Sequence, residues 1–355
     1  MYSRRRLRFE TRFPVIQAPM AGSGINTPQL AAAVSNAGGL GSVATAYLGI
    51  SQVEQVIRHV RKLTGKPFAV NLFAPSSREI LAGDVESQIR LLAPIYQRMG
   101  LEEPVLPQHI DEPFQELVEL LISLDISIVS FTFGILPKDV LEQFKAHGTY
   151  LMGTATTVAE AQSLESAGVD AVIAQGSESG GHRGSFSSSS PSAVGTMALV
   201  PQIVDAIQAP VIASGGIMDG RGIVAALALG ASAVQMGTAF LTCAESGAPE
   251  VYKQAVLEAA DDSTELTRAF SGRWARGIRN DFMVQSQQSG SEPISFPWQN
   301  ELTRGMRNAA AKRGDKELLS LWAGQGTRLA RRMTVAQLMA ALEAEIQQTR
   351  LALVE

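Results

Sequence analysis

Eight short runs of apolar, largely β-branched residues recur along the chain, and segments with helical periodicity separate them. The runs are apolar at nearly every position, which is typical of parallel strands covered on both faces. The predicted strands span residues 14–18, 40–43, 68–73, 126–133, 150–153, 171–175, 210–214 and 233–237. Eight strand–helix alternations predict an α/β protein with a (β/α)8 TIM barrel, and a doubly wound sheet is the competing fold.

Helix boundary signals support the alternation. Thr27 and Pro28 predict the start of the first helix, and Gly38 follows its end. Ser51 is the expected N-cap of a second helix that runs to about Thr64. Four further barrel helices are expected over residues 137–146, 157–167, 196–208 and 219–229.

Two stretches break the alternation. Residues 76–123 form a Leu-, Glu- and Gln-rich excursion after the third strand, and residues 246–355 follow the last strand. Both show helical periodicity, with helices expected in the second stretch at 251–259, 320–322 and 334–350. We therefore predict a discontinuous barrel (1–75 and 124–245) under a mainly helical cap that the two stretches build together.

Composition narrows the class of protein. The chain has 355 residues, 45% of them hydrophobic, and a net charge of −4, so it can bury a large core and has no bulk attraction to nucleic acid. No apolar run reaches the roughly 18 residues of a membrane helix, and the basic start lacks a signal-peptide core. Cys243 is the only cysteine, which excludes an intramolecular disulfide and a thiolate metal cluster. We expect a cytoplasmic protein with no bound metal.

A glycine-rich loop, Gln175 to Gly184 (QGSESGGHRG), follows the sixth predicted strand. Glycines allow the backbone to approach a ligand closely. His182 lies in this loop and titrates near neutral pH in its ordinary state, which suits a proton-transfer group. The Ser-rich segment 185–191 that follows is either a flexible linker or a mobile lid over the site.

The loops after the seventh and eighth strands are candidates for phosphate binding. Small residues (Gly215 and Gly216) follow the seventh strand, and Asp219 to Gly222 open a helix; Gln235, Met236, Gly237 and Thr238 end the eighth strand. Helix N-termini and free backbone amides bind phosphate, and barrels often use these two loops for it. The chain has no strand-associated GxGxxG and no GxxxxGK[ST], so it offers no Rossmann or P-loop nucleotide site.

Motifs along nearly the whole chain resemble those of the nitronate monooxygenase (2-nitropropane dioxygenase) family, in particular the class of bacterial enzymes that act on propionate 3-nitronate. The matching blocks are QAPMAG (17–22), AAAVSNAGGLGSV (31–43), FAVNLF (68–73), SFTFG (130–134), QGSESGGHRGSF (175–186), PVIASGGIMDGRG (210–222), QMGTAFL (235–241) and FSGRWARGI (270–278). Trp274 stands where the family more often has a small residue or proline, so it either narrows the substrate entrance or packs against the cap.

The resemblance implies an FMN-dependent oxidoreductase. It places FMN at Asn71, Gln175, Gly180, Gly181, Gly215, Gly216, Gln235, Met236, Gly237 and Thr238. Met20 either packs against the flavin ring or is an ordinary core methionine. The catalytic residue implied is His182, either as a base for a neutral nitroalkane or as an imidazolium that binds a nitronate. Arg183 either attracts an anionic substrate or lies on the surface.

The activity implied is oxidation of alkyl nitronates, such as propionate 3-nitronate, by O2 to carbonyl compounds and nitrite. The alternative is an NAD(P)H-dependent flavin reductase of the quinone or enoyl reductase type, since fold does not decide between them. The expected partners are a small nitronate and O2, with neither nucleic acid nor membrane, and the protein is expected to be a monomer or homodimer.

Overall fold

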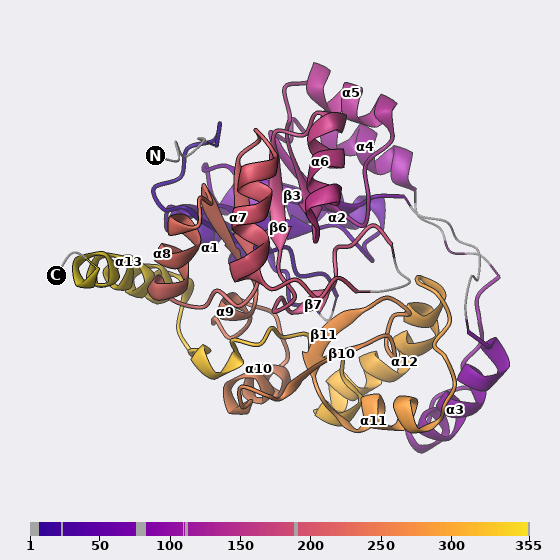
Figure 1. Cartoon of the computed structure of the whole chain (residues 1–355). Helices are drawn as coiled ribbons and strands as arrows, with labels where there is room; N and C mark the ends of the chain where they lie inside the picture. The colour runs from indigo at the N-terminus through magenta and orange to yellow at the C-terminus, as the bar shows by residue number, and fades with distance from the viewer. Residues whose placement is uncertain are drawn as a thin grey trace.

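A parallel sheet of eight strands forms the centre of the molecule (Figure 1). The computed structural model describes residues 7–22, 24–75, 83–108, 110, 113–187 and 191–353. The strands are β1 (Val15–Gln17), β2 (Gly41–Ala44), β3 (Phe68–Phe73), β4 (Ile128–Thr132), β5 (Tyr150–Ala155), β6 (Ala171–Gln175), β8 (Val211–Ser214) and β9 (Ala233–Met236). Each overlaps one predicted run, so the eight strands are confirmed.

The sheet closes into a barrel. Its strand order is β1-β9-β8-β6-β5-β4-β3-β2, so β1 and β2 are its two ends. A parallel bridge between Ile16 and Leu40 joins these ends, with the Gln17 amide donating to the Leu40 carbonyl at 2.9 Å. The predicted TIM-like barrel is therefore confirmed, and the doubly wound sheet is wrong.

Helices cover the outside of the barrel. They are α1 (Pro28–Asn36), α2 (Ile50–Leu63), α5 (Lys138–Ala146), α6 (Val158–Ala167), α7 (Thr196–Ala206) and α8 (Gly220–Ala228), with the short α9 (Thr238–Leu241) after the last strand. Thr27 caps α1 through its side chain, as predicted. The N-cap of α2 is Gly49, not Ser51, because the Gln52 side chain accepts a hydrogen bond from the Gly49 amide and starts the helix earlier.

A second group of helices lies beyond one end of the barrel and has its own apolar core. It contains α3 (Val85–Arg98), α10 (Glu250–Glu258), α11 (Asp281–Gln288), α12 (Trp298–Arg313) and the 3-10 turn η1 (Lys316–Leu318). Figure 1 shows α3 beside α12, although they are far apart in the sequence. No helix of the described residues is long and apolar enough to cross a membrane.

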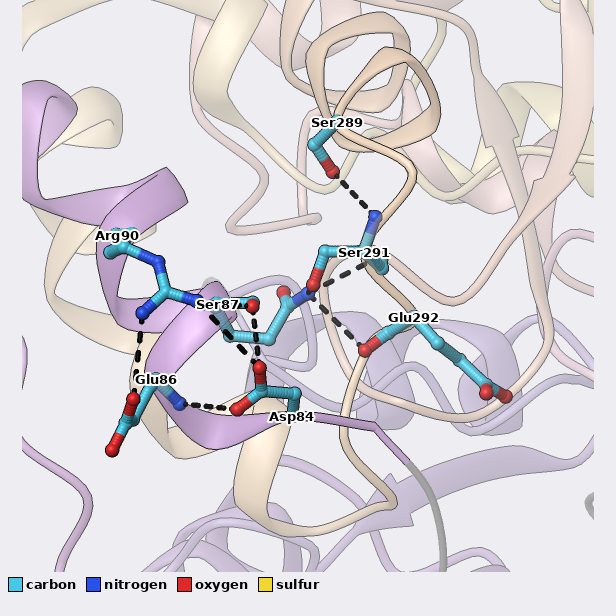
Figure 2. A network of polar contacts seen from close by, with 8 residues as sticks. Asp84, Glu86, Ser87, Arg90, Ser289, Ser291 and Glu292 are labelled. Atoms are coloured by element: carbon cyan, nitrogen blue, oxygen red, sulfur yellow. Dashed lines mark hydrogen bonds and ion pairs between the residues drawn. The ribbon is translucent and has the colours of Figure 1, made fainter.

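Polar contacts attach the excursion to the C-terminal segment. At the start of α3, Asp84 caps the helix, accepting from the Glu86 amide and the Ser87 hydroxyl (Figure 2). One turn on, the buried Gln88 amide donates to the Ser291 hydroxyl at 2.8 Å and accepts from Gln299 at 2.9 Å. The predicted association of residues 76–123 with residues 246–355 therefore includes specific polar contacts through Gln88.

Two helices of these stretches lie on the barrel wall instead. Helix α4 (Phe114–Ser123) packs against α2, and α13 (Val335–Ala352) packs against α1 and α8. Their buried side chains join the apolar core of the barrel. Both lie within the ranges predicted as cap, 76–123 and 246–355, so residue ranges alone do not separate the cap from the barrel wall.

The helix expected at residues 320–322 does not exist. The Leu321 carbonyl accepts from the Ile278 amide at 2.8 Å, and Trp322 forms an antiparallel bridge with Gly277. The segment is extended because its backbone pairs with a neighbouring strand. A further turn, η2 (Thr327–Leu329), separates it from α13.

That neighbouring strand belongs to a small antiparallel sheet that the sequence did not predict. Its strands are β10 (Thr264–Thr267), β11 (Ala275–Ile278) and β7 (Gly181–His182), in the order β10-β11-β7. Strand β11 thus carries the C-terminal segment across the mouth of the barrel to the glycine-rich loop.

Candidate active site

One pocket gathers the catalytic histidine and the FMN-binding residues that the family resemblance implies. It lies at the carboxyl ends of the barrel strands, where parallel barrels bind ligands. The predicted residues that line it are Met20, Asn71, Gln175, Gly180, Gly181, His182, Gly215, Gly216, Gln235, Met236, Gly237 and Thr238. The structure brings them together; their individual roles remain predictions.

Pairing between two strands presents His182 to the pocket. His182 is opposite Ala275 and Gly181 is opposite Arg276 in the β7–β11 ladder. Gly181 has a φ of 73°, a left-handed conformation that glycine adopts without strain. The predicted catalytic loop is therefore fixed as an edge strand, with its histidine held by the C-terminal segment.

Side chains within the loop tie it to the barrel. Gln175 uses both ends of its amide: Nε2 donates to the His182 carbonyl at 3.1 Å, and Oε1 accepts from the Gly184 amide at 2.8 Å. The guanidinium of Arg183 is fully buried and donates to the carbonyls of Gln175 and Gly176. Both expectations for Arg183, a substrate contact or a surface side chain, are wrong because its guanidinium is hydrogen-bonded to the backbone of this loop.

The imidazole of His182 contacts a serine that the sequence analysis did not single out. Its Nε2 lies 2.8 Å from Oγ of Ser271. Ser271 Oγ is also 3.1 Å from the Arg273 carbonyl and accepts from the Arg273 amide at 3.3 Å. Ser271 lies in the block FSGRWARGI, so the motif contained it, but only the strand pairing shows that it reaches the histidine.

Aromatic rings surround the imidazole. The ring centroids of Trp322 and Phe133 lie 5.7 and 5.8 Å from that of His182. Phe133 has a φ of 77°, which is strained for a residue with a large side chain and is typical of functional sites. Both rings line the pocket. Trp274, expected either to narrow the substrate entrance or to pack against the cap, is not among the described residues that line the pocket.

Burial lowers the pKa of His182 to about 3. The positive charges of Arg273 and Arg307 add to the effect of burial. Glu160 acts electrostatically on Arg273 and Glu301 on Arg307, but neither arginine forms a salt bridge with a carboxylate among the described residues, so both charges are only partly offset. The imidazole is therefore neutral at neutral pH, in a pocket with a surplus of positive charge.

At the end of the pocket near β8 and β9, small residues surround an unpaired hydroxyl. Ser179 is buried, and its Oγ has no hydrogen-bond partner among the described residues. Gly215 and Gly216 have φ values of 121° and 69°, and a Cβ on Gly215 would lie 2.8 Å from that hydroxyl. Thr238 begins α9, whose first amides have no partner within the helix. These groups are donors suited to a phosphate.

The N-terminus of α8, also expected to bind phosphate, is already occupied. The Asp219 carboxylate accepts from the amides of Arg221 and Gly222 at 3.0 and 3.2 Å. The Gly220 amide donates to Glu345 at 2.9 Å. The expectation is wrong for this helix end, because carboxylates of the chain itself satisfy its amides.

Polar groups on other strands face the same pocket. Asn71 is buried, and its Nδ2 donates to the Ser130 hydroxyl at 3.0 Å, which leaves Oδ1 for a ligand. Gln235 at the end of β9 is also buried and lines the pocket. From the cap, Asn300 and Arg307 of α12 line it as well. Sequence reasoning missed Arg307 because nothing in the polar pattern of α12 distinguishes it from its other basic residues.

Comparisons with known proteins identify the family of the chain. The profile of the family described as nitronate monooxygenase matches residues 5–345. A probable nitronate monooxygenase from Staphylococcus saprophyticus is 46% identical over 326 residues, which cover 91% of each chain.

Solved structures extend the similarity to the fold. The structure of a nitroalkane oxidase from Streptomyces ansochromogenes matches with a TM-score of 0.91 and 41% identity, over 97% of this chain and 98% of that one. FabK from Thermotoga maritima matches with a TM-score of 0.76 and 32% identity, over 97% and 95% of the two chains.

Proposed function

The chain belongs to the nitronate monooxygenase family of oxidoreductases, and on that premise we propose that it uses FMN and O2 to oxidise alkyl nitronates to carbonyl compounds and nitrite, with His182 at the reacting end of the substrate. One observation carries the proposal. A neutral imidazole lies in an aromatic pocket that holds only partly offset positive charge and a set of phosphate-binding groups.

The residues present fit FMN. The unpaired Ser179 hydroxyl, with the backbone at Gly215, Gly216 and Thr238, would hold the phosphate. Close packing supports a preformed cradle, because a Cβ on Gly180 would lie 2.5 Å from the backbone of Ala323 and Gly324. Asn71, Gln175 and Gln235 would meet the polar edge of the flavin ring, with Met20 against its face. When bound, FMN supplies the redox chemistry between substrate and O2.

The low pKa of His182 argues against both of its predicted roles. A base whose conjugate acid has a pKa near 3 is a poor acceptor for a proton on carbon. An imidazole that stays neutral also cannot bind a nitronate as an imidazolium cation. His182 therefore acts as a neutral hydrogen-bonding group that orients a substrate already in its nitronate form, and the charge of that anion is balanced by Arg273, the stronger of the two cations that act on the imidazole.

Propionate 3-nitronate is the substrate we favour within the class. It carries the nitronate anion that the electropositive pocket suits, and it is small enough for a site walled by Phe73, Phe133 and Trp322.

Oxygen uptake tests the function. The FMN-loaded protein should consume O2 with propionate 3-nitronate or propyl-1-nitronate, produce nitrite, and need no NAD(P)H. It should be slow with the same compounds in the neutral nitro form. A protein that does not bind FMN, or that consumes no O2 with either nitronate, contradicts the proposal.

The second candidate is an NAD(P)H-dependent flavin reductase of the quinone or enoyl reductase type, since the same barrel and cofactor pocket would serve it. Rapid bleaching of the flavin by NADH or NADPH without oxygen, together with no O2 uptake on nitronates, would favour this candidate.

A further inference from the structure

Arg307 is a cation in the pocket with only neutral partners. Its Nε donates to the Thr303 hydroxyl at 3.2 Å, and its Nη2 donates to the carbonyl and to Oδ1 of Asn300, both at 2.8 Å. It forms no salt bridge with any carboxylate of the described residues. Asn300 and Arg307 both line the pocket.

The Glu301 carboxylate acts on this charge electrostatically but forms no salt bridge with it, so a directly bound counter-ion is still absent among the described residues. Burial lowers the pKa of Arg307 but leaves the guanidinium charged, because its ordinary pKa is so high. A buried charge is stabilised when a counter-charge is paired with it and hydrogen-bonded to it. The contacts to Thr303 and Asn300 fix the plane of the guanidinium and occupy Nε and Nη2, so Nη1 is left to donate a charge-assisted hydrogen bond to a carboxylate.

Arg307 lies at a different end of the pocket from His182. A row of aromatic rings runs from Tyr47 to Phe73 to Phe133 to His182, with centroid separations of 6.2, 4.5 and 5.8 Å. Arg304, one turn before Arg307 on α12, lies over the Tyr47 ring at 5.9 Å, so α12 approaches the far end of this row. Of the three causes that lower the pKa of His182, Arg307 is the weakest. An anionic group bound at Arg307 would therefore be a second group, separate from the one at His182.

We propose that Arg307, held in place by Asn300 and Thr303, binds a carboxylate at the end of the substrate remote from the nitronate. The enzyme would then select nitronates that carry a second negative charge and would use alkyl nitronates, whose only charge is the nitronate itself, poorly. This inference rests on the proposed function for the identity of the reacting group, but the carboxylate site itself can be tested by binding.

Binding measurements on the FMN-loaded protein test the carboxylate site separately from the oxidation of nitronates. We would titrate it calorimetrically with 3-nitropropionate in its nitro form, whose only charge is the carboxylate, and with 1-nitropropane, which lacks the carboxylate. The carboxylate compound should bind about 10-fold to 100-fold more tightly, as one charge-assisted contact provides. Arg307→Gln should abolish that difference, and Arg307→Lys should keep part of it, because lysine retains the charge but not the planar fork.

Lys312→Gln is the matched control. It removes one positive charge from the same helix at an exposed position outside the pocket and should leave both affinities unchanged. Equal affinities for the two compounds in the parent protein, or equal weakening of both by Arg307→Gln, would overturn the inference. If Arg307→Gln does not fold, the parent and Arg307→Lys titrations decide. A parent protein that prefers the carboxylate but oxidises no nitronate would refute the proposed function and keep the carboxylate site.

Discussion

Nε2 of His182 and Oγ of Ser271 lie 2.8 Å apart, and they join the glycine-rich loop to a segment about ninety residues further along the chain. A neutral imidazole carries one N–H, and the Ser271 hydroxyl has one proton to donate. If that proton goes to the Arg273 carbonyl, Nε2 of the histidine carries its own proton and donates to Ser271. If it goes to Nε2, Nδ1 carries the N–H. The direction of the Ser271 hydroxyl and the tautomer of His182 are therefore coupled.

Replacing His182 tests whether the imidazole takes part in catalysis. His182→Ala should lower kcat/KM for a nitronate by about 10²–10³-fold, because a hydrogen-bonding group positioned at the reacting end is lost. FMN content should stay near that of the parent. The control is His147→Ala, since His147 lies at the end of α5 and pairs with Asp125 far from the pocket. An unchanged rate in His182→Ala would remove the imidazole from the mechanism.

Ser271→Ala removes the partner of the imidazole without touching the substrate pocket's charge. One neutral hydrogen bond is worth about 0.5–1.5 kcal/mol, so we expect kcat to fall roughly 2-fold to 12-fold. KM should change less than kcat, because the histidine loses its orientation and the pocket keeps its cations. Steady-state kinetics of this variant beside Ser163→Ala, an exposed helix serine, measures the effect. Equal losses in the two variants would contradict an orienting role.

The pH profile of catalysis should lack the ordinary histidine ionisation. The pKa of His182 is lowered to about 3 by burial and by Arg273 and Arg307. The imidazole therefore stays neutral from pH 8 to pH 5, and kcat/KM for a nitronate should show no step near pH 6.5 that His182→Ala removes. Finding such a step would show that the histidine is protonated in the working range.

The same shift makes stability depend on pH in a defined direction. His182 is unprotonated in the folded protein down to a pKa of about 3, whereas in the unfolded chain it binds a proton below its ordinary value of 6.5. The unfolded state thus binds more protons between these values, so stability is full above pH 6.5 and falls as the pH drops toward 3. From pH 7 to pH 5 this one group contributes a loss of about 2 kcal/mol. Urea unfolding should show a larger loss of unfolding free energy between pH 7 and pH 5 for the parent than for His182→Gln, which lacks the imidazole.

Gly180→Ala tests the cradle proposed for FMN. The added Cβ would lie 2.5 Å from backbone atoms of Ala323 and Gly324, which cannot move as a side chain could. We expect a loss of about 1–3 kcal/mol in stability and a clear loss of bound FMN. The matched control is Gly65→Ala, where a Cβ meets nothing within 4 Å. Full FMN content in Gly180→Ala would show that this close packing does not shape the site.

The sequence was most informative where local patterns decide structure. Continuous apolar runs located all eight barrel strands, and Thr27 and Thr157 identified helix starts that their side chains do cap. Glycine-rich strand ends led to residues that share one pocket. Each of these features depends on a few neighbouring residues, which the sequence displays directly.

Features that depend on distant pairing could not be predicted. Strand β7 is two residues long and exists only because β11 pairs with it. Arg183 was expected to be either a substrate contact or a surface side chain, but the loop folds around it and its guanidinium donates to the carbonyls of that loop. Arg307 became a candidate only when α12 placed it over the barrel mouth. In each case the contacting group lies far along the chain or is a backbone atom, so no local pattern in the sequence reveals the contact.

The most direct test of the account is the absorption spectrum of the FMN-loaded protein under argon. Added propionate 3-nitronate should change the flavin spectrum quickly, while NADH and NADPH should leave it unchanged, and His182→Ala should slow the response to the nitronate. Rapid bleaching by NADH or NADPH with no response to the nitronate would contradict the account and identify the protein as a flavin reductase.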